Sequence, residues 1–295
     1  MTRPMSTKSV FALLALSFCI ASVFGQQPAA AGPGTGAHPA ILEGDPSLPT
    51  HAIYRPENLA PFGKSLKLPL VVWANGACYN YSTHYAPFLT EIASHGFLVI
   101  AIGPATGGTG NDTKSSQLLD AIDWATAENQ RAGSKYAGKV DIAKIAVMGH
   151  SCGGLEALEV ATDPRVTTAV IWSSGVLNDF TKGPAMPVHV SKDTLQQLHS
   201  PVAYFTGGKQ DVAYPNATDD FARIHKIPAF LASLEVGHGG TYSQPNGGPF
   251  GIVGVAWLEW QLKGDKRAAK MFTGPACGLC ADSRWTVQQK LNPGL

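Results

Sequence analysis

Charged residues are scarce in this chain. Asp, Glu, Lys and Arg make up 15% of its 295 residues, the formal net charge is +1, and the basic side chains form no cluster. Such a chain lacks the positive field that attracts nucleic acid or an anionic membrane surface. We therefore expect neither nucleic acid nor, once a leader is removed, a membrane as a partner.

Long apolar runs are also few. The one at residues 10–24 is 15 residues long, follows Arg3 and Lys8, and is short for a membrane span. Val23 and Gly25 are small enough to precede a signal-peptidase cleavage site. We predict a signal peptide over residues 1–25, with an uncleaved anchor as the alternative, and hence a secreted protein (extracellular or periplasmic).

Cysteine is rare, and one of the five cysteines lies in the predicted leader. The remaining four are Cys78, Cys152, Cys277 and Cys280. An even number in an oxidising compartment predicts two disulfides, for which three connectivities exist. Cys277 and Cys280 form a single C-x-x-C, and one such pair without a second is a poor zinc signal. We expect no metal.

The rest of the chain divides into a linker and one domain. Residues 26–46 are rich in Pro, Gly and Ala, which predicts a linker, and residues 47–295 are expected to form a single domain. Short apolar runs predict buried strands at residues 68–73, 97–102, 144–148, 166–172, 202–205 and 227–234. Helical spacing predicts helices at residues 84–94, 115–131, 155–161 and 250–262. This alternation indicates an α/β fold with a mostly parallel central sheet and helices on both faces. Residues 173–200 interrupt the alternation, which predicts a surface excursion.

The sharpest motif is Gly-His-Ser-Cys-Gly-Gly at residues 149–154. It directly follows a predicted strand and opens a predicted helix. In that context G-x-S-x-G is typical of a nucleophile elbow, a strained turn that presents the serine at the edge of the sheet of an α/β-hydrolase fold. We therefore predict Ser151 as a nucleophile.

A serine nucleophile needs a base, which in this fold follows the serine and an acid in chain order. His238 lies in a glycine-rich loop just after the last predicted strand, where the fold delivers its base. The other histidines are less suitable, because His189 and His199 lie in the excursion and His225 lies in a helical stretch. We predict His238 as the base.

The orienting acid should follow the fifth predicted strand. Asp211 lies in the loop directly after residues 202–205 and is our prediction. Asp219 and Asp220 come later, in a helical pattern, and are interpreted as solvated charges. Asp211 would hold the imidazole of His238 in the correct tautomer.

Charge that develops on a substrate oxygen needs fixed donors. We predict the backbone N–H groups of Cys152 and of Ala77, which lies in the loop after the first strand. If both N–H groups point at one oxygen, the two backbones run close together, which predicts a Cys78–Cys152 disulfide. The alternative is that Cys152 is a small buried residue and Cys78 an unrelated loop thiol. In either case we expect Cys277 and Cys280 to form a local disulfide.

These motifs, with Trp172-Ser173-Ser174 and the segment at residues 73–76, occur in an order that resembles secreted dienelactone-hydrolase-like and cutinase-like (polyester hydrolase) members of the α/β-hydrolase superfamily. The resemblance covers roughly residues 50–265. It implies that Trp172 flanks the acyl site, although a core tryptophan at a strand end fits equally. Ala77 and Cys152 depart from the pattern, because those hydrolases look as though they have an aromatic residue and a methionine there.

Together the motifs and the resemblance imply a serine esterase that hydrolyses a small or polymer-borne carboxylic ester through an acyl-enzyme, with no cofactor. A lactone or amide hydrolase on the same residues, or a silent binding module, are the alternatives. Tyr214, with the other tyrosines near the motifs, is a candidate substrate contact or half-buried surface. The other tyrosines of this group are Tyr79, Tyr81, Tyr85 and Tyr242.

Overall fold

One sheet organises the chain. The computed structural model describes residues 32–110, 112–178, 188 and 190–291, and within them nine strands form a single sheet in the order β1-β2-β4-β3-β5-β6-β7-β8-β9. The strands are β1 Ala40–Glu43, β2 His51–Pro56, β3 Leu68–Ala74, β4 Leu98–Ile102, β5 Val140–His150, β6 Val166–Trp172, β7 Val202–Thr206, β8 Ala229–Leu234 and β9 Trp285–Lys290. The pairs from β4 to β8 are parallel, whereas β1, β2 and β9 add antiparallel edges.

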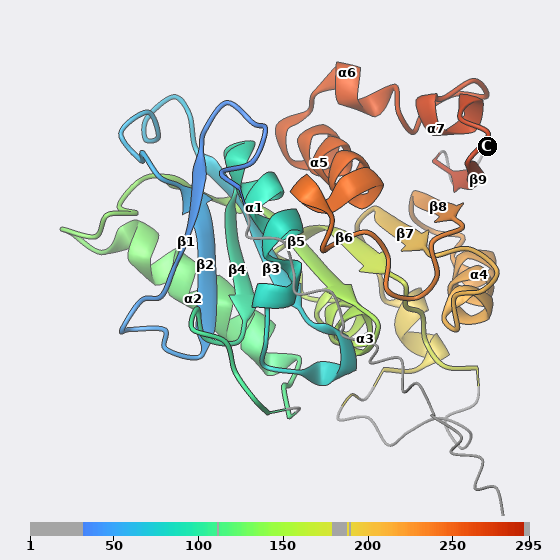
Figure 1. Ribbon diagram of the computed structural model, residues 1–295, viewed down its shortest axis with the longest axis horizontal. Coiled ribbons are helices and arrows are strands. Elements are labelled where there is room, and N and C mark those ends of the chain that lie inside the picture. Colours follow the sequence, from blue (N-terminus) through green and yellow to red (C-terminus); the bar gives the residue numbers. More distant parts are fainter. Residues whose placement is uncertain (1–31, 111, 179–187, 189, 292–295) are drawn as a thin grey trace, which may run out of the picture.

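Helices cover both faces of the sheet (Figure 1). Their bounds are α1 Ala86–Ser94, α2 Ser116–Gln130, α3 Cys152–Val160, α4 Tyr214–Arg223, α5 Gly248–Lys263, α6 Lys266–Ala269 and α7 Gly278–Ala281. Apolar residues of α2, α3 and α4 pack on one face, and those of α1 and α5 pack on the other. The two clusters confirm the predicted mostly parallel sheet with helices on both sides.

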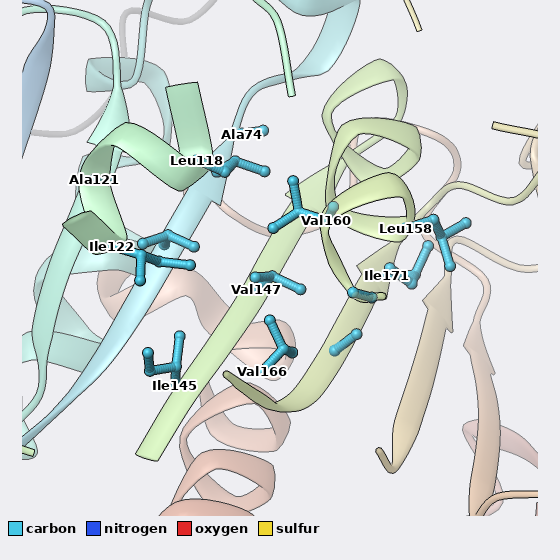
Figure 2. Close-up of a cluster of buried hydrophobic side chains, with 14 of the residues drawn as sticks. Ala74, Leu118, Ala121, Ile122, Ile145, Val147, Leu158, Val160, Val166 and Ile171 are labelled. Atoms are coloured by element: carbon cyan, nitrogen blue, oxygen red, sulfur yellow. The ribbon is translucent and has the colours of Figure 1, made fainter. Parts of the chain in front are cut away.

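The central strands read as unbroken apolar runs because both of their faces are covered. Figure 2 shows one of these faces, where Val147 of β5 and Ile171 of β6 meet Leu118 and Ile122 of α2 and Leu158 of α3. Every residue of β3 and β4 is buried, as is every residue of β7 and β8. The rigid centre of the sheet therefore carries the loops that hold the predicted site.

The six predicted strands and four predicted helices are all present, with bounds that differ by a few residues. The antiparallel strands β2 and β9 were not predicted, since their sequences carry polar residues that break the apolar runs. Parts of the predicted excursion at residues 173–200 lie outside the described residues, namely 179–187 and 189.

The predicted linker at residues 26–46 is wrong in its second half. Ala40–Glu43 forms β1 and pairs with β2, and Glu43 makes an ion pair with the largely buried guanidinium of Arg55. Thr35 and Gly36 are hydrogen-bonded to side chains of α1. This stretch is therefore part of the domain from Thr35 onward. The predicted signal peptide, residues 1–25, and residues 26–31 lie outside the described residues.

Among the described residues, no helix has the length and apolar character needed to cross a membrane.

Candidate active site

Ser151 occupies a tight turn between the end of β5 and the start of α3. Its φ is 53° and its ψ is −119°, a region that non-glycine residues rarely adopt. A Cβ on Gly149 would collide with the carbonyl of Gly153, and a Cβ on Gly153 would collide with the carbonyl of Ala74. The glycines therefore let strand and helix pack backbone against backbone. The hydroxyl of Ser174 donates a hydrogen bond of 2.6 Å to the carbonyl oxygen of Ser151.

The structure brings Ser151, His238 and Asp211 together. His238 Nε2 lies 2.9 Å from Ser151 Oγ, and His238 Nδ1 lies 2.7 Å from Asp211 Oδ1. Because an ionised carboxylate can only accept, Nδ1 carries the proton and Nε2 is free to accept one from the serine hydroxyl. This is the arrangement in which an imidazole activates a serine oxygen as a nucleophile.

Asp211 lies in the loop after β7 and is buried. Its carboxylate accepts hydrogen bonds from the backbone N–H groups of Gly207, at 2.8 Å, and Ala213, at 2.9 Å. Burial on its own would raise the pKa of Asp211, but the hydrogen bonds from His238 and these two N–H groups lower it to about 2. Asp211 is therefore a carboxylate at neutral pH.

Two of the three alternative bases do not reach Ser151. His199 Nε2 contacts the carbonyl of Val166 at the opposite end of β6, and His225 is exposed just beyond the end of α4, so its predicted helical position is wrong. His189 lies outside the described residues.

The alternative acids are also occupied elsewhere. Asp219 pairs with Arg223 and Lys192 near the surface. Asp220 is not the solvated charge that the sequence suggested, because it is fully buried and accepts from Lys192 Nζ and from the N–H of Val176. This difference arises because α4 turns Asp220 toward the sheet, where the hydroxyl of Tyr204 also meets it.

The loop after β3 reaches the start of α3. Cys78 and Cys152 form a disulfide with a Cα–Cα distance of 5.3 Å, as predicted. Ala77 and Cys78 both have a positive φ, and the carbonyl of Cys78 accepts from the N–H of Thr113. The amide of Cys152 is the first N–H of α3, and the first N–H groups of a helix lack partners within it. Both predicted donor residues thus lie on segments that the disulfide joins.

Two residues that the sequence did not single out shape this region. Asn75, which lies in the segment at residues 73–76, is buried and donates to the carbonyls of Tyr79 and Ile102. Its Oδ1 accepts from the indole N–H of Trp73. Ser174 is the other, through its bond to the Ser151 carbonyl. An Asn-Gly pair directly after a buried strand was the available signal for the first, and the Trp172-Ser173-Ser174 motif was the available signal for the second.

The structure decides between the two interpretations of Trp172. Its side chain is fully buried and stacks on Phe205, with ring centroids 4.7 Å apart, and it also packs edge-on against Phe88. The prediction that Trp172 flanks the acyl site is therefore wrong, because no part of the indole is accessible. Tyr214 is partly buried at the first position of α4, in the segment that follows Asp211.

The second predicted disulfide, Cys277–Cys280, is also present and staples α7. Among the described residues, no group of three or more His, Cys, Asp or Glu side chains is arranged to hold a metal ion.

Comparisons with known proteins identify a family and several relatives. A family model described as PETase, PET hydrolase-like, matches residues 80–286, which include Ser151, Asp211 and His238 but not the loop that carries Ala77. A cutinase of Thermobifida alba, est1, is 31% identical over 197 residues, covering 65% of this chain and 60% of that protein. A cutinase of Thermobifida fusca is 31% identical over 195 residues, covering 64% and 58%. A bis(hydroxyethyl) terephthalate hydrolase of Streptomyces coelicolor is 28% identical over 193 residues, covering 63% and 55%. The chain thus spans about 60% of the length of the first of these relatives.

Proposed function

The chain belongs to the PET hydrolase-like family, and from this premise we propose that it is a serine esterase that hydrolyses carboxylic esters through an acyl-enzyme on Ser151. The observation that carries the proposal is the hydrogen-bonded series from Ser151 Oγ through His238 to Asp211, placed on a nucleophile elbow. The cutinases and the bis(hydroxyethyl) terephthalate hydrolase named above support ester chemistry.

The first half-reaction follows from these positions. Ser151 Oγ attacks the carbonyl carbon of the ester while His238 Nε2 takes the serine proton. Asp211, ionised at neutral pH, holds Nδ1–H and stabilises the imidazolium. The oxyanion of the tetrahedral intermediate accepts hydrogen bonds from the backbone N–H groups of Ala77 and Cys152. His238 then returns its proton to the alcohol oxygen, the C–O bond breaks, and the acyl group stays on Ser151.

The second half-reaction repeats these roles with water. His238 Nε2 takes a proton from a water molecule as its oxygen attacks the acyl carbon, and the same two N–H groups stabilise the second oxyanion. The proton then returns from His238 to Ser151 Oγ as the carboxylic acid leaves. Besides the ester and water, the two steps as written use only groups of the chain.

The surroundings of the triad favour a substrate with an apolar part. Large apolar side chains are exposed on the loops that carry the proposed machinery: Tyr79 follows the Ala77 loop and is 48% exposed, Val212 follows Asp211 and is 75% exposed, and Val236 precedes His238 and is 37% exposed. Exposed apolar groups gathered around a site favour apolar ligands. We propose that the substrate is an ester of this character, either a small molecule or part of a polymer.

Export is proposed on two grounds. The two disulfides suit an oxidising compartment, and residues 1–25 have the pattern of a cleaved leader.

The test is a chromogenic short-acyl ester assay combined with a serine-directed phosphonate. Ser151→Ala is expected to lower kcat by about 10⁴- to 10⁶-fold, because loss of a triad member removes the nucleophile or its activation. The phosphonate is expected to label Ser151. Ser65→Ala, at an exposed position in the loop before β3, is the control and is expected to keep full activity. A Ser151→Ala protein with more than a few per cent of the activity would refute the assignment.

A further inference from the structure

Two buried side chains lie among the three loops of the proposed site. Tyr85 precedes α1, and His150 occupies the position between Gly149 and Ser151 in the elbow. Their polar atoms are 2.8 Å apart, Tyr85 Oη to His150 Nδ1. Tyr85 Oη also lies 3.0 Å from the N–H of Gly76, and His150 Nε2 lies 2.9 Å from the carbonyl oxygen of His238.

The direction of each hydrogen bond follows from its ends. A carbonyl oxygen only accepts, so His150 Nε2 carries a proton and donates to the carbonyl of His238. Burial lowers the pKa of His150 to about 4, so the ring is neutral at pH 7 and its Nδ1 is an acceptor. Tyr85 must therefore donate its O–H to Nδ1, and its oxygen accepts the N–H of Gly76. Every polar atom of the pair is used.

Close packing leaves this series of bonds no room to shift. A Cβ on Gly76 would lie 2.6 Å from His150 Nδ1 and 2.8 Å from Tyr85 Oη, so only glycine fits. The ring of Tyr242 packs on both partners, with centroids 5.3 Å from that of Tyr85 and 4.9 Å from that of His150. Tyr242 is fully buried and so is not a substrate contact, and its hydroxyl, which lies near that of Ser173, forms no hydrogen bond of ordinary geometry with a described residue. Tyr242 therefore contributes packing but no bond.

We propose that Tyr85 and His150 are positioning residues that hold the oxyanion loop and the base loop in register with Ser151. The inference rests on the proposed function. One end of the series is the amide of Gly76, next to the proposed donor Ala77. The other end is the backbone of His238 itself, and His150 is the chain neighbour of Ser151. The side chains of Tyr85 and His150 thus link the oxyanion loop, the base loop and Ser151, whose relative placement sets the rate of ester hydrolysis.

The expected consequence is kinetic. Loss of the series lets the oxyanion loop and His238 move relative to Ser151, and displacements of about 1 Å at a reacting centre lower rates by about 100-fold. Binding of the ester in the ground state depends on other contacts, so kcat should fall while KM stays nearly constant. A merely structural role would change stability and leave the kcat of the folded protein unchanged.

The experiment compares Tyr85→Phe with Tyr242→Phe, two hydroxyl deletions in one aromatic cluster. Tyr85→Phe is expected to lower kcat by about 10- to 100-fold with KM within about twofold of wild type. Tyr242→Phe removes a hydroxyl without a partner and is expected to keep the wild-type kcat. Equal kcat for Tyr85→Phe and wild type would overturn the inference.

A double-mutant cycle tests whether the two residues act together. In His150→Gln the amide N–H₂ is placed to donate to the His238 carbonyl, and the acceptor for Tyr85 is lost. The double variant Tyr85→Phe/His150→Gln should therefore be no slower than Tyr85→Phe alone within about twofold. Losses that multiply would mean independent roles and would overturn the inference.

A measurement on the wild-type protein does not depend on any variant folding. The ¹⁵N shifts of His150 should report a neutral ring protonated at Nε2, and a ring protonated at Nδ1 would contradict the proposed direction of the bonds. Failure of the proposed function looks different, because the wild-type protein would then neither hydrolyse esters nor be labelled at Ser151.

Discussion

Four non-glycine residues near the site have a positive φ, a conformation that side chains normally avoid. Ala77 and Cys78 follow β3, Ser151 follows β5 and Ser173 follows β6, with φ values of 53°, 50°, 53° and 41°. Such residues cost on the order of 1–3 kcal/mol each and persist only where their surroundings hold them. Here the surroundings are a disulfide, a glycine-lined helix start and the carbonyl of Phe205, which accepts the N–H of Ser173. All four lie at the carboxyl edge of the sheet, where a strained backbone can hold the groups of the proposed site in fixed positions.

At Asp211, replacing one carboxylate oxygen by an amide nitrogen should strongly lower kcat. Asp211→Asn keeps the side chain's shape but removes the carboxylate that fixes His238 Nδ1–H, so kcat for ester hydrolysis is expected to fall by about 10⁴-fold. Asp219→Asn is the matched control, because within the described part of the chain Asp219 pairs with Arg223 and Lys192 near the surface. Steady-state kinetics at neutral pH measure both. A larger loss at Asp219 than at Asp211 would place the acid elsewhere.

At the scale of elements, α3 carries a buried acid as well as the start of the elbow. Glu156 is fully buried on its inner face, where Oε1 accepts from Thr113 Oγ1 at 2.9 Å and Oε2 has no partner among the described residues. Burial raises the pKa of Glu156 from 4.5 to about 7. A carboxyl without a cation at its side prefers to stay protonated in such a place.

Glu156 should therefore make stability fall with rising pH. In the unfolded chain the carboxyl loses its proton near pH 4.5, and in the folded protein only near pH 7. Between these values the folded state binds more protons than the unfolded state. The stability that protonated Glu156 contributes is therefore fully present below about pH 4.5 and is lost by about pH 7. The shift corresponds to about 3 kcal/mol. The side chain of Glu156→Gln is neutral at every pH. The free energy of unfolding of this variant, relative to that of wild type, should therefore rise by about 3 kcal/mol between pH 4.5 and pH 8.

Urea unfolding at pH 4.5, 6 and 8 measures that difference. Glu159→Gln is the control on the same helix, because Glu159 is partly exposed and its charge is the smallest of the three causes that set the pKa of Glu156, so its loss should change the pH dependence much less. A Glu156→Gln protein whose stability relative to wild type is the same at all three pH values would contradict the prediction.

At the scale of the whole molecule, the two disulfides differ in what they join. Cys78–Cys152 links residues 74 positions apart, whereas Cys277–Cys280 links residues three positions apart. Closing the longer loop removes more entropy from the unfolded chain, which corresponds to about 4 kcal/mol against about 2 kcal/mol for the short one. Cys78 and Cys152 are buried, but Cys280 is exposed.

Two outcomes are expected. Relative to wild type, the double variant Cys78→Ala/Cys152→Ala should lose more free energy of unfolding than the double variant Cys277→Ala/Cys280→Ala. Urea unfolding under non-reducing conditions measures both losses. Mild reductant on the native protein should open Cys277–Cys280 first, as read by alkylation and peptide mapping, because only that bond offers an exposed sulfur. Cys78 alkylated ahead of Cys280 would contradict the second expectation.

The sequence by itself was enough for the fold class and for the three residues that the structure brings together as the proposed triad. The strands of a parallel sheet are buried on both faces, so their apolar runs are visible without any knowledge of their neighbours. The turn that carries Ser151 is also marked locally, by glycines that must sit at fixed offsets from it. The chain order of Ser151, Asp211 and His238 follows from the order of the strands.

Only the tertiary structure decided the rest. Residues 40–43 form a strand because they pair with β2, and no local pattern predicts this pairing. Trp172 is in the core because α1 and α5 close over it, although its place at a strand end suited a binding site equally well. The bond between Tyr85 and His150 joins residues 65 positions apart. Hydrogen bonds and burial of this kind depend on which segments meet in space, whereas a sequence pattern records only what each segment prefers on its own.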